Sequence, residues 1–184
     1  MNHKKLSIPE VILFEPEVYK DKRGFNFEAF NLKDFKNITG KNVNFVQTNI
    51  SISKKNVLRG IHYQISPFSQ GKLVQVVHGE IFDVAVDLRK SSKNFGKWVG
   101  AKLSFRNKNL LWIPEGFGHG FLVLSKKALI HYHLTNFYNQ KKEKSIIWDD
   151  KQIDIRWADK KKIKPIISVK DQKGSKLINA KVFK

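Results

Sequence analysis

Short stretches in which apolar and polar residues alternate, separated by turn residues, run through most of the chain. In residues 72–89 (KLVQVVHGEIFDVAVDLR), the pair His78-Gly79 divides two such stretches. Alternation with a period of two is typical of half-buried β-strands, and glycine marks the turn between them. Similar stretches predict further strands over residues 42–52, 57–64, 97–105, 110–113, 120–124 and 128–137.

Only residues 31–38 (NLKDFKNI) have a helical spacing of apolar residues, and this predicted helix ends before Thr39-Gly40. A turn is predicted at residues 114–118 (PEGFG). Many short strands with regular turns favour an antiparallel sandwich or barrel. Because no repeat or linker interrupts the pattern, we expect one domain over residues 1–184. Its core would span about 16–158, and the lysine-rich residues 159–184 would form a C-terminal arm.

The composition excludes several classes of protein. With 184 residues and 41% hydrophobic residues, the chain can bury a substantial core. It has no cysteine, which excludes disulfides, thiolate zinc sites and cysteine nucleophiles. No apolar run approaches the roughly 20 residues that cross a bilayer, and the first residues lack the apolar stretch of a secretory signal. We therefore expect a cytoplasmic protein without a membrane partner.

The net charge of +19 raises the question of a polyanionic partner. Of the 35 basic residues only five are arginine, whereas nucleic-acid readers use arginine heavily for two-pronged contacts. The lysines are spread along the chain, which favours a solvated surface over a nucleic-acid site. A phosphorylated small molecule is compatible with this charge.

The stretch 57–64 (VLRGIHYQ) holds the densest group of candidate functional residues, including Arg59 and His62. His62 could be a metal ligand, a general base or a structural histidine. There is no GxGxxG, Walker-type loop or GxSxG motif, so nothing indicates dinucleotide, triphosphate or serine-nucleophile chemistry. Arg59 and His62 would face opposite sides of a regular strand, so a shared site requires an irregularity at Gly60.

A metal site is one alternative. Small β-barrels often bind metal through an HxH pair, but position 64 is glutamine, two residues after His62. His131 and His133 do have HxH spacing and share one face of a strand. We favour an exposed or interface face for this pair and predict no metal.

Acid–base chemistry without a metal is the other alternative. His62 can titrate near neutral pH, Lys72 begins a strand, and Tyr132 points with Ile130 and Leu134 towards an apolar interior. A proton-transfer enzyme needs a base, an acid and a donor for a developing oxyanion, and these residue types suit the three tasks. Their spacing in the sequence does not show that they converge.

Ten short segments together resemble the dTDP-4-dehydrorhamnose 3,5-epimerase family, a branch of the cupin fold. The resemblance covers about residues 16–171. The matching segments are Asp21-x-Arg23-Gly24, Phe27-Glu28, Phe45-Val46-Gln47-x-Asn49, VLRGIHYQ (57–64), QGKLVQVVHGEIFDVAVDLR (70–89), FGKWVG (95–100), LWIPEGFGHGFLVLS (111–125), Tyr138-Asn139, WDD (148–150) and Ser168-Val169-Lys170-Asp171. The resemblance implies an all-β double-stranded β-helix, or jelly-roll barrel, of antiparallel strands with a few short helices.

The resemblance also implies a cofactor-independent isomerase. Members of the family convert dTDP-4-dehydro-6-deoxy-D-glucose to dTDP-4-dehydro-L-rhamnose in dTDP-L-rhamnose biosynthesis, which supplies polysaccharide and O-antigen precursors. The C4 ketone acidifies the protons at C3 and C5, so each centre inverts through an enolate. By similarity His62 is the base, oriented by Asp171, Tyr132 is the acid, and Lys72 stabilises the enolate oxygen.

The substrate-binding residues implied by the resemblance extend over the whole chain. They are Arg23, Glu28, Gln47, Asn49, Arg59, His119, Tyr138, Glu143 and Lys170. The family forms homodimers with exchanged N-terminal strands, so Arg23 and Glu28 are expected to serve the partner's site.

The chain departs from the family pattern at three positions. Gly118 replaces an alanine, Gln140 replaces a proline, and the loop at Pro67 has one proline where the family often has two. These differences leave the catalytic set intact. Three alternatives stay open: an epimerase that acts at one carbon or on another nucleotide, a polyanion-binding barrel without activity, and a metal-dependent cupin oxygenase.

Overall fold

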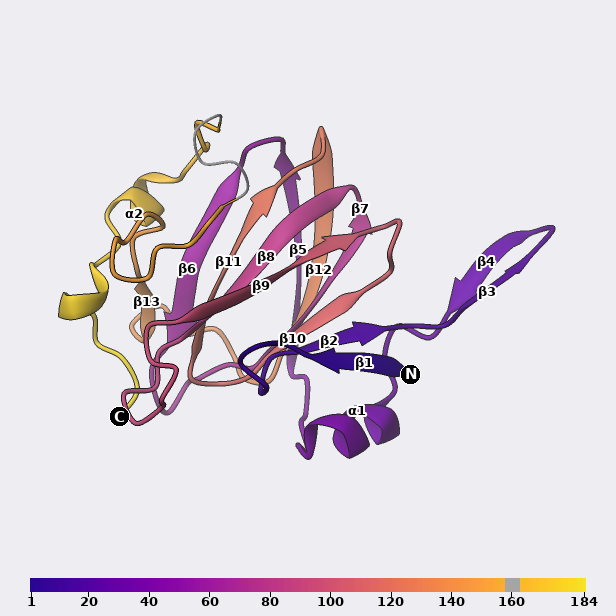
Figure 1. The fold of residues 1–184 in the computed structure, drawn as a ribbon, viewed down its shortest axis with the longest axis horizontal. Helices are drawn as coiled ribbons and strands as arrows, with labels where there is room; N and C mark the ends of the chain where they lie inside the picture. The colour runs from indigo at the N-terminus through magenta and orange to yellow at the C-terminus, as the bar shows by residue number, and fades with distance from the viewer. Residues whose placement is uncertain (158–162) are drawn as a thin grey trace.

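Two antiparallel sheets face each other in a jelly-roll sandwich, which confirms the predicted fold class (Figure 1). The computed structural model describes residues 1–157 and 163–184. The first sheet has the order β1 (Asn2–Lys5), β2 (Ile12–Glu15), β10 (Leu110–Ile113), β7 (Lys72–His78), β12 (Lys127–Leu134) and β5 (Gln47–Lys54). The second has the order β13 (Glu143–Ser145), β6 (Leu58–Gln64), β11 (Phe117–Val123), β8 (Glu80–Asp87) and β9 (Trp98–Ser104).

The main core lies between the two sheets. Alternate residues of each strand point into it, as Val74 and Val76 of β7 and Ile81 and Ala85 of β8 do. The intervening residues of β8, including Val84, pack on the other side of the second sheet in a separate apolar cluster. The period of two in the sequence thus corresponds to two buried faces of one sheet.

The segment before β5 forms a projecting hairpin and a helix. Strands β3 (Val18–Asp21) and β4 (Gly24–Phe27) pair only with each other and extend away from the sandwich (Figure 1). Helix α1 (Leu32–Thr39) confirms the predicted helix within one residue. The Asn31 side chain caps its first turn by accepting bonds from two backbone amides, and Gly40 ends it in the left-handed region.

The strand predictions were correct in place but not at every end. Residues 42–46 are not a strand, and β11 begins at Phe117, inside the predicted turn. Strands β1, β2 and β13 and the β3–β4 hairpin were not predicted, because three or four residues show too little alternation.

The periodicity of the sequence indicated only one helix, whereas the resemblance implied a few short ones, and the structure has more than one. Helix α2 (Val169–Gln172) and the 3-10 helix η1 (Leu177–Asn179) are also present. Each is only one turn long, so neither produces a helical period in the sequence. The start of α2 is defined instead by the Ser168 hydroxyl, which accepts a hydrogen bond from the Asp171 amide.

Residues 163–184 pack along the second sheet. Isolated bridges join Val57 to Ile166, Ile146 to Ser175 and Arg89 to Phe183, and Leu177 enters the apolar cluster on the outer side of that sheet. The expected boundary between residues 158 and 159 lies outside the described residues, so the single-domain organisation stays a prediction. None of the helices among the described residues is long and apolar enough to cross a membrane.

Strand β6 has the irregularity that a shared site for Arg59 and His62 requires. The register between β6 and β11 shifts near Gly60, and Leu58 and Ile61, three residues apart, enter the same apolar cluster. Gly60 has φ of 123°, and a Cβ atom there would lie 2.5 Å from the Gly120 Cα, so only glycine fits. Arg59 and His62 therefore face the inside of the sandwich together.

Candidate active site

His62 and Asp171 form a hydrogen-bonded pair at the centre of the site. The His62 Nε2 lies 2.6 Å from the Asp171 Oδ1, and the other Asp171 oxygen accepts a bond from the Gly60 amide at 3.3 Å. Burial would raise the pKa of Asp171, but the bonds from His62, Gly60 and Ser168 hold it below its usual value. The His62 side chain is 27% exposed, whereas that of Asp171 is 3% exposed. The ring can thus meet a ligand while its carboxylate partner stays sheltered.

Lys72 enters the same space from the first sheet. It is the first residue of β7, is buried, and its Nζ donates to the His62 carbonyl oxygen at 3.5 Å. Burial lowers the pKa of Lys72 to about 8, while the carboxylates of Asp83 and Glu143 act in the opposite direction. The ammonium is still mostly charged at neutral pH and titrates just above it.

Tyr132 lies on the same face of the first sheet as Lys72. Tyr132 pairs with Val74 of β7, two residues after Lys72, and packs against the core cluster that contains Ile130. The predicted orientation of Tyr132 towards the interior is therefore confirmed. His62 comes from the second sheet, so a histidine and a tyrosine stand on opposite walls of one space.

Tyr138, Glu143 and Lys170 form a connected group beside this space. The Tyr138 hydroxyl donates to Glu143 at 2.8 Å, and the Lys170 Nζ lies 2.5 Å from the same carboxylate. Burial would raise the pKa of Glu143, but the bonds from Lys170 and Tyr138 hold it below its usual value. Tyr138 is 53% exposed, so a flat aromatic surface is available to a ligand.

Three further predicted residues line the inner face at strands β5 and β6. Gln47 donates to the Asn49 side chain at 3.0 Å and accepts from the Tyr138 amide at 2.8 Å. Arg59 donates to the Ser53 hydroxyl at 3.1 Å. These bonds hold amide and guanidinium groups along one side of the space.

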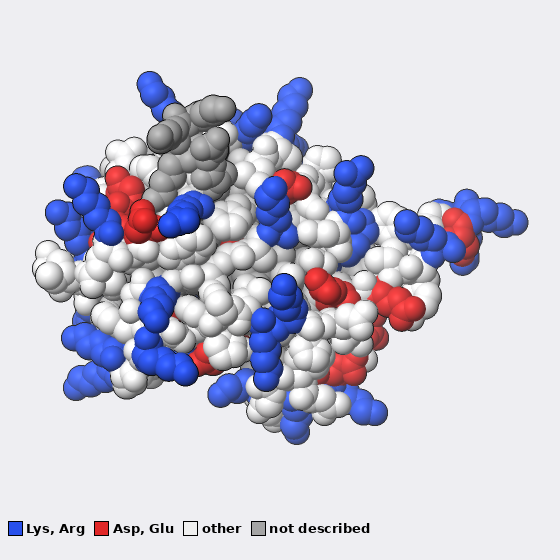
Figure 2. Space-filling view, viewed as in Figure 1, with Lys and Arg blue, Asp and Glu red and all other residues white. Residues whose placement is uncertain are grey.

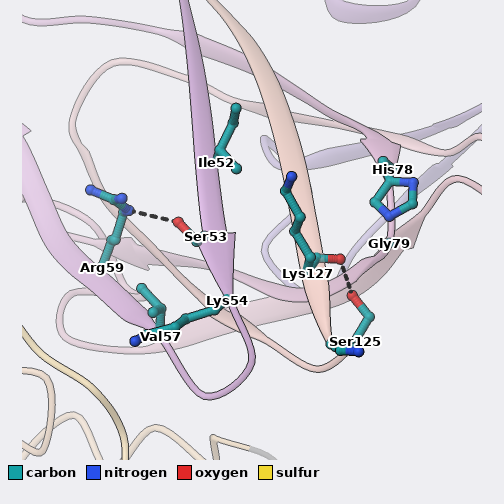
Figure 3. A pocket seen from close by; sticks show the side chains of 10 residues that line it. Ile52, Ser53, Lys54, Val57, Arg59, His78, Gly79, Ser125 and Lys127 are labelled. Carbon is teal, nitrogen blue, oxygen red and sulfur yellow. Dashed lines mark hydrogen bonds between the residues drawn. The ribbon is translucent and has the colours of Figure 1, made fainter.

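A hollow of about 860 Å³ adjoins Arg59 at the end of the sandwich where β5 ends and β12 begins (Figure 3). Arg59 and Ser53 lie on one side of β5, while Ile52, His78 and Lys127 lie on the other. His62, Lys72 and Tyr132 do not line it. The hollow therefore lies beside the space that these three residues face, and Arg59 is the predicted site residue that lines it.

His119 is buried and is the cross-strand partner of His62, and its hydrogen-bond partner Asp83 was missed by the sequence analysis. The His119 Nε2 lies 2.6 Å from the Asp83 Oδ1. Burial lowers the pKa of His119, although Asp83 opposes this shift. The signal for Asp83 is present in the sequence, because it is an acidic residue within the otherwise apolar run IFDVAV.

Within one chain, Arg23 and Glu28 do not lie with His62, Lys72 and Tyr132. Arg23 lies at the tip of the projecting hairpin, where its side chain is 84% exposed and bonds to Asp21 (Figure 1). Glu28 follows β4 and accepts a bond from Asn31.

His131 and His133 lie on the opposite face of β12 from Tyr132. Their rings are 4.6 Å apart, and His133 bonds to Thr48 of β5 at 2.9 Å. Among residues 1–157 and 163–184, no three His, Cys, Asp or Glu side chains are grouped so that they could hold a metal ion.

Comparison with known proteins identifies the family. A family model described as dTDP-4-dehydrorhamnose 3,5-epimerase matches residues 5–179. The chain belongs to the dTDP-4-dehydrorhamnose 3,5-epimerase family. It is 54% identical over 183 residues to the dTDP-4-dehydrorhamnose 3,5-epimerase of Shigella flexneri, covering 100% of this chain and 99% of that protein. As a member of this 3,5-epimerase family the chain is an enzyme of the isomerase class.

Solved structures of relatives share the whole fold. The epimerase of Legionella pneumophila in complex with dTDP-4-keto-L-rhamnose is 44% identical, with a TM-score of 0.92 over 98% of this chain and 94% of that one. A 3'-monoepimerase of Streptomyces bikiniensis in complex with dTDP-quinovose is 31% identical, with a TM-score of 0.89 over 95% of this chain and 87% of that one. The similarity therefore extends both to a 3,5-epimerase and to a monoepimerase.

Proposed function

We propose that this 3,5-epimerase family member converts dTDP-4-dehydro-6-deoxy-D-glucose to dTDP-4-dehydro-L-rhamnose, in dTDP-L-rhamnose biosynthesis. The observation that carries the proposal is the placement of His62, with its partner Asp171, opposite Tyr132, with Lys72 between the two sheets. A base and an acid on opposite sides of a sugar ring are what inversion of a carbon requires.

In the proposed mechanism His62 removes the proton at C3 or C5. The Asp171 carboxylate accepts a hydrogen bond from the Nε2–H group of His62, which leaves Nδ1 to take the proton from carbon. The electron pair moves onto the C4 oxygen, where the Lys72 ammonium stabilises the enolate. Tyr132 then donates a proton to the opposite face of the same carbon. These side chains supply every proton step, so we propose that no cofactor takes part.

We assign substrate binding to residues around this group. The Arg59 guanidinium suits the pyrophosphate, because its fork can pair two oxygens at once. The exposed ring of Tyr138 offers a surface on which a base can stack. The remaining contacts, to the nucleotide and the sugar, are assigned to Gln47, Asn49, His119, Glu143 and Lys170.

We further propose that the protein acts as a homodimer that exchanges its N-terminal strands. The outer face of the first sheet exposes Ile50 by 65%, Ile52 by 56% and Val77 by 39%. Such an apolar face is typical of an interface. The hairpin that carries Arg23 projects away from its own body, so it is free to reach a partner's site together with Glu28.

We place the reaction in the cytoplasm, where its product would feed polysaccharide or O-antigen synthesis. The lysine-rich surface does not require a polyanionic partner. Figure 2 shows lysine and arginine side chains spread over the visible face, interspersed with acidic groups, rather than gathered in one patch.

Deuterium exchange tests the proposed reaction. In deuterated water, NMR of the 4-keto nucleotide sugar should show deuterium at both C3 and C5. His62→Ala should lower the rate by roughly 10²–10⁴-fold, because the base is lost. His78→Ala, which changes an exposed histidine at the end of β7, is the matched control and should exchange normally. No exchange at either carbon with the unaltered protein would overturn the proposal.

A single-centre epimerase is the second candidate, favoured by the similarity to the 3'-monoepimerase of Streptomyces bikiniensis. The same NMR experiment separates the two candidates, because exchange at one carbon alone identifies the narrower activity. Tyr132 and Tyr138 are both present, which favours inversion at both carbons.

A further inference from the structure

Asp83 has a fully buried carboxylate to which the proposed mechanism gives no role. It lies in the middle of β8, and its neighbours on the inner face, Ile81 and Ala85, belong to the main core. The cross-strand partners Phe121 and Ala101 are apolar as well. A carboxylate in such surroundings is costly to fold unless other groups compensate its charge.

Only one of the two Asp83 oxygens has a hydrogen-bond partner among the described residues. Oδ1 lies 2.6 Å from the His119 Nε2, and Oδ2 is buried without a partner. A single neutral imidazole does not compensate a full negative charge. A positive charge nearby must therefore contribute.

Lys72 is the cation that stands in this position. It is buried in the same interior and donates to the carbonyl oxygen of His62, whose cross-strand partner His119 bonds to Asp83. This bond uses one of the three donors of the ammonium, and the Asp83 charge acts to raise the pKa of Lys72. The other titratable groups that face Lys72 are Glu143 of β13, Lys170 of α2 and His119 of β11. Lys170 is repulsive, and its charge is already paired with Glu143. Asp83 is thus the attractive partner that has an oxygen free.

We propose that Asp83 is a positioning residue for the epimerisation: it keeps the Lys72 ammonium charged and holds the His119 ring towards the substrate. This inference rests on the proposed function. Asp83 does not touch the substrate in this account. It acts through two side chains that do.

Lys72 depends on Asp83 because its pKa lies only slightly above neutral pH. Burial has already brought the pKa of Lys72 to about 8, so its ammonium titrates close to neutral pH. A neutral amine cannot stabilise an enolate by charge. Loss of the Asp83 charge removes an attraction from the ammonium and lowers the pKa of Lys72 further.

The test is the pH profile of kcat for Asp83→Asn, an isosteric change that removes the charge. The alkaline limb of the unaltered enzyme should lie near pH 8, where Lys72 titrates. In Asp83→Asn this limb should move down by about one pH unit or more, with a kcat at pH 8 that is lower by roughly fivefold or more and a smaller change in KM. The acid limb of the profile should stay in place.

Asp87→Asn is the matched control. Asp87 lies on the same strand and is equally buried, but it is paired with Arg89 at 2.6 Å. Its loss should lower thermal stability and leave the alkaline limb where it was. A merely structural role of Asp83 predicts the same outcome for Asp83→Asn, and that result would overturn the proposal.

A direct titration separates this inference from the proposed activity. NMR of ¹³C-methylated lysines, with Lys72→Arg to assign the signal, follows Lys72 without any substrate. A lower Lys72 midpoint in Asp83→Asn supports the inference even if deuterium exchange fails, and an unchanged midpoint overturns it. Should the amide not fit, Asp83→Ser gives the same readout. If neither neutral variant folds while Asp83→Glu does, the role is structural and the proposal is wrong.

Discussion

Lys72 illustrates at the scale of one residue how a functional group can oppose folding. The pKa of Lys72 falls from 10.5 in the unfolded chain to about 8 in the folded one, so the folded protein binds fewer protons between these values. Stability therefore rises with pH through this window, and below pH 8 the full cost of the buried charge is present. A shift of this size corresponds to a cost on the order of 3 kcal/mol.

We expect Lys72→Met to be inactive and more stable than the unaltered protein at pH 7. The burial cost of the Lys72 charge exceeds the attraction that Asp83 and Glu143 return. Methionine fills a similar volume without a charge, so the free energy of unfolding should still rise by about 1–3 kcal/mol although Asp83 loses an attractive neighbour. Urea unfolding at pH 7 and pH 10 measures this, and the gain should shrink at pH 10. Lys102→Met, on the exposed side of β9, is the control and should change little. A destabilised Lys72→Met would show that the ammonium is well compensated.

The individual residues of the site were recoverable from the sequence to different degrees. His62, Lys72 and Tyr132 stand in alternating strands, so their direction follows from the period of two. The pairing of His62 with Asp171 joins positions 109 residues apart and depends on a one-turn helix, which no local pattern predicts. Asp83 was missed because its neighbours define a strand, and no rule of periodicity gives a role to a buried charge.

At the scale of elements, the β3–β4 hairpin contacts the body through a cation between two aromatic rings. The Lys108 Nζ lies 4.3 Å from the centre of the Phe25 ring and 3.8 Å from that of Phe105, and the two rings are 5.6 Å apart. Lys108 and Phe105 belong to the loop between β9 and β10. This contact joins the hairpin to the body and fixes its direction.

Lys108→Met should therefore raise KM for the nucleotide sugar roughly two- to tenfold with little change in kcat. Methionine keeps the packing between the rings but loses the cation–π attraction, which is worth about 0.5–2 kcal/mol. Steady-state kinetics measures this split. Arg106→Met, in the same loop, is the control. A lower kcat with an unchanged KM would mean that the hairpin does not deliver Arg23 and Glu28 to a binding site.

Two elements show where prediction from sequence was sufficient and where it was not. Helix α1 carries its own signals, since Asn31 caps its start and Gly40 ends it. The course of β6 depends on Gly60, which allows a backbone conformation that alternation cannot encode and lets Gly120 approach closely. The sequence required an irregularity at Gly60 only because Arg59 and His62, three residues apart, would face opposite sides of a regular strand.

At the scale of the whole molecule, the proposed strand exchange makes each active site a product of two chains. His62 would come from one body, and Arg23 would come from the hairpin of the partner. A mixed dimer of His62→Ala and Arg23→Ala chains then contains one site with both changes and one site with neither.

Co-expression of these two inactive variants should restore activity. Random pairing gives half mixed dimers, each with one intact site of two, so about a quarter of the unaltered rate is expected. The two variants expressed separately are the controls, and their samples mixed without subunit exchange should stay inactive. Deuterium exchange at C3 and C5 measures the recovery. If Arg23 served its own chain, every site in the mixture would carry one of the two changes, and no activity would return.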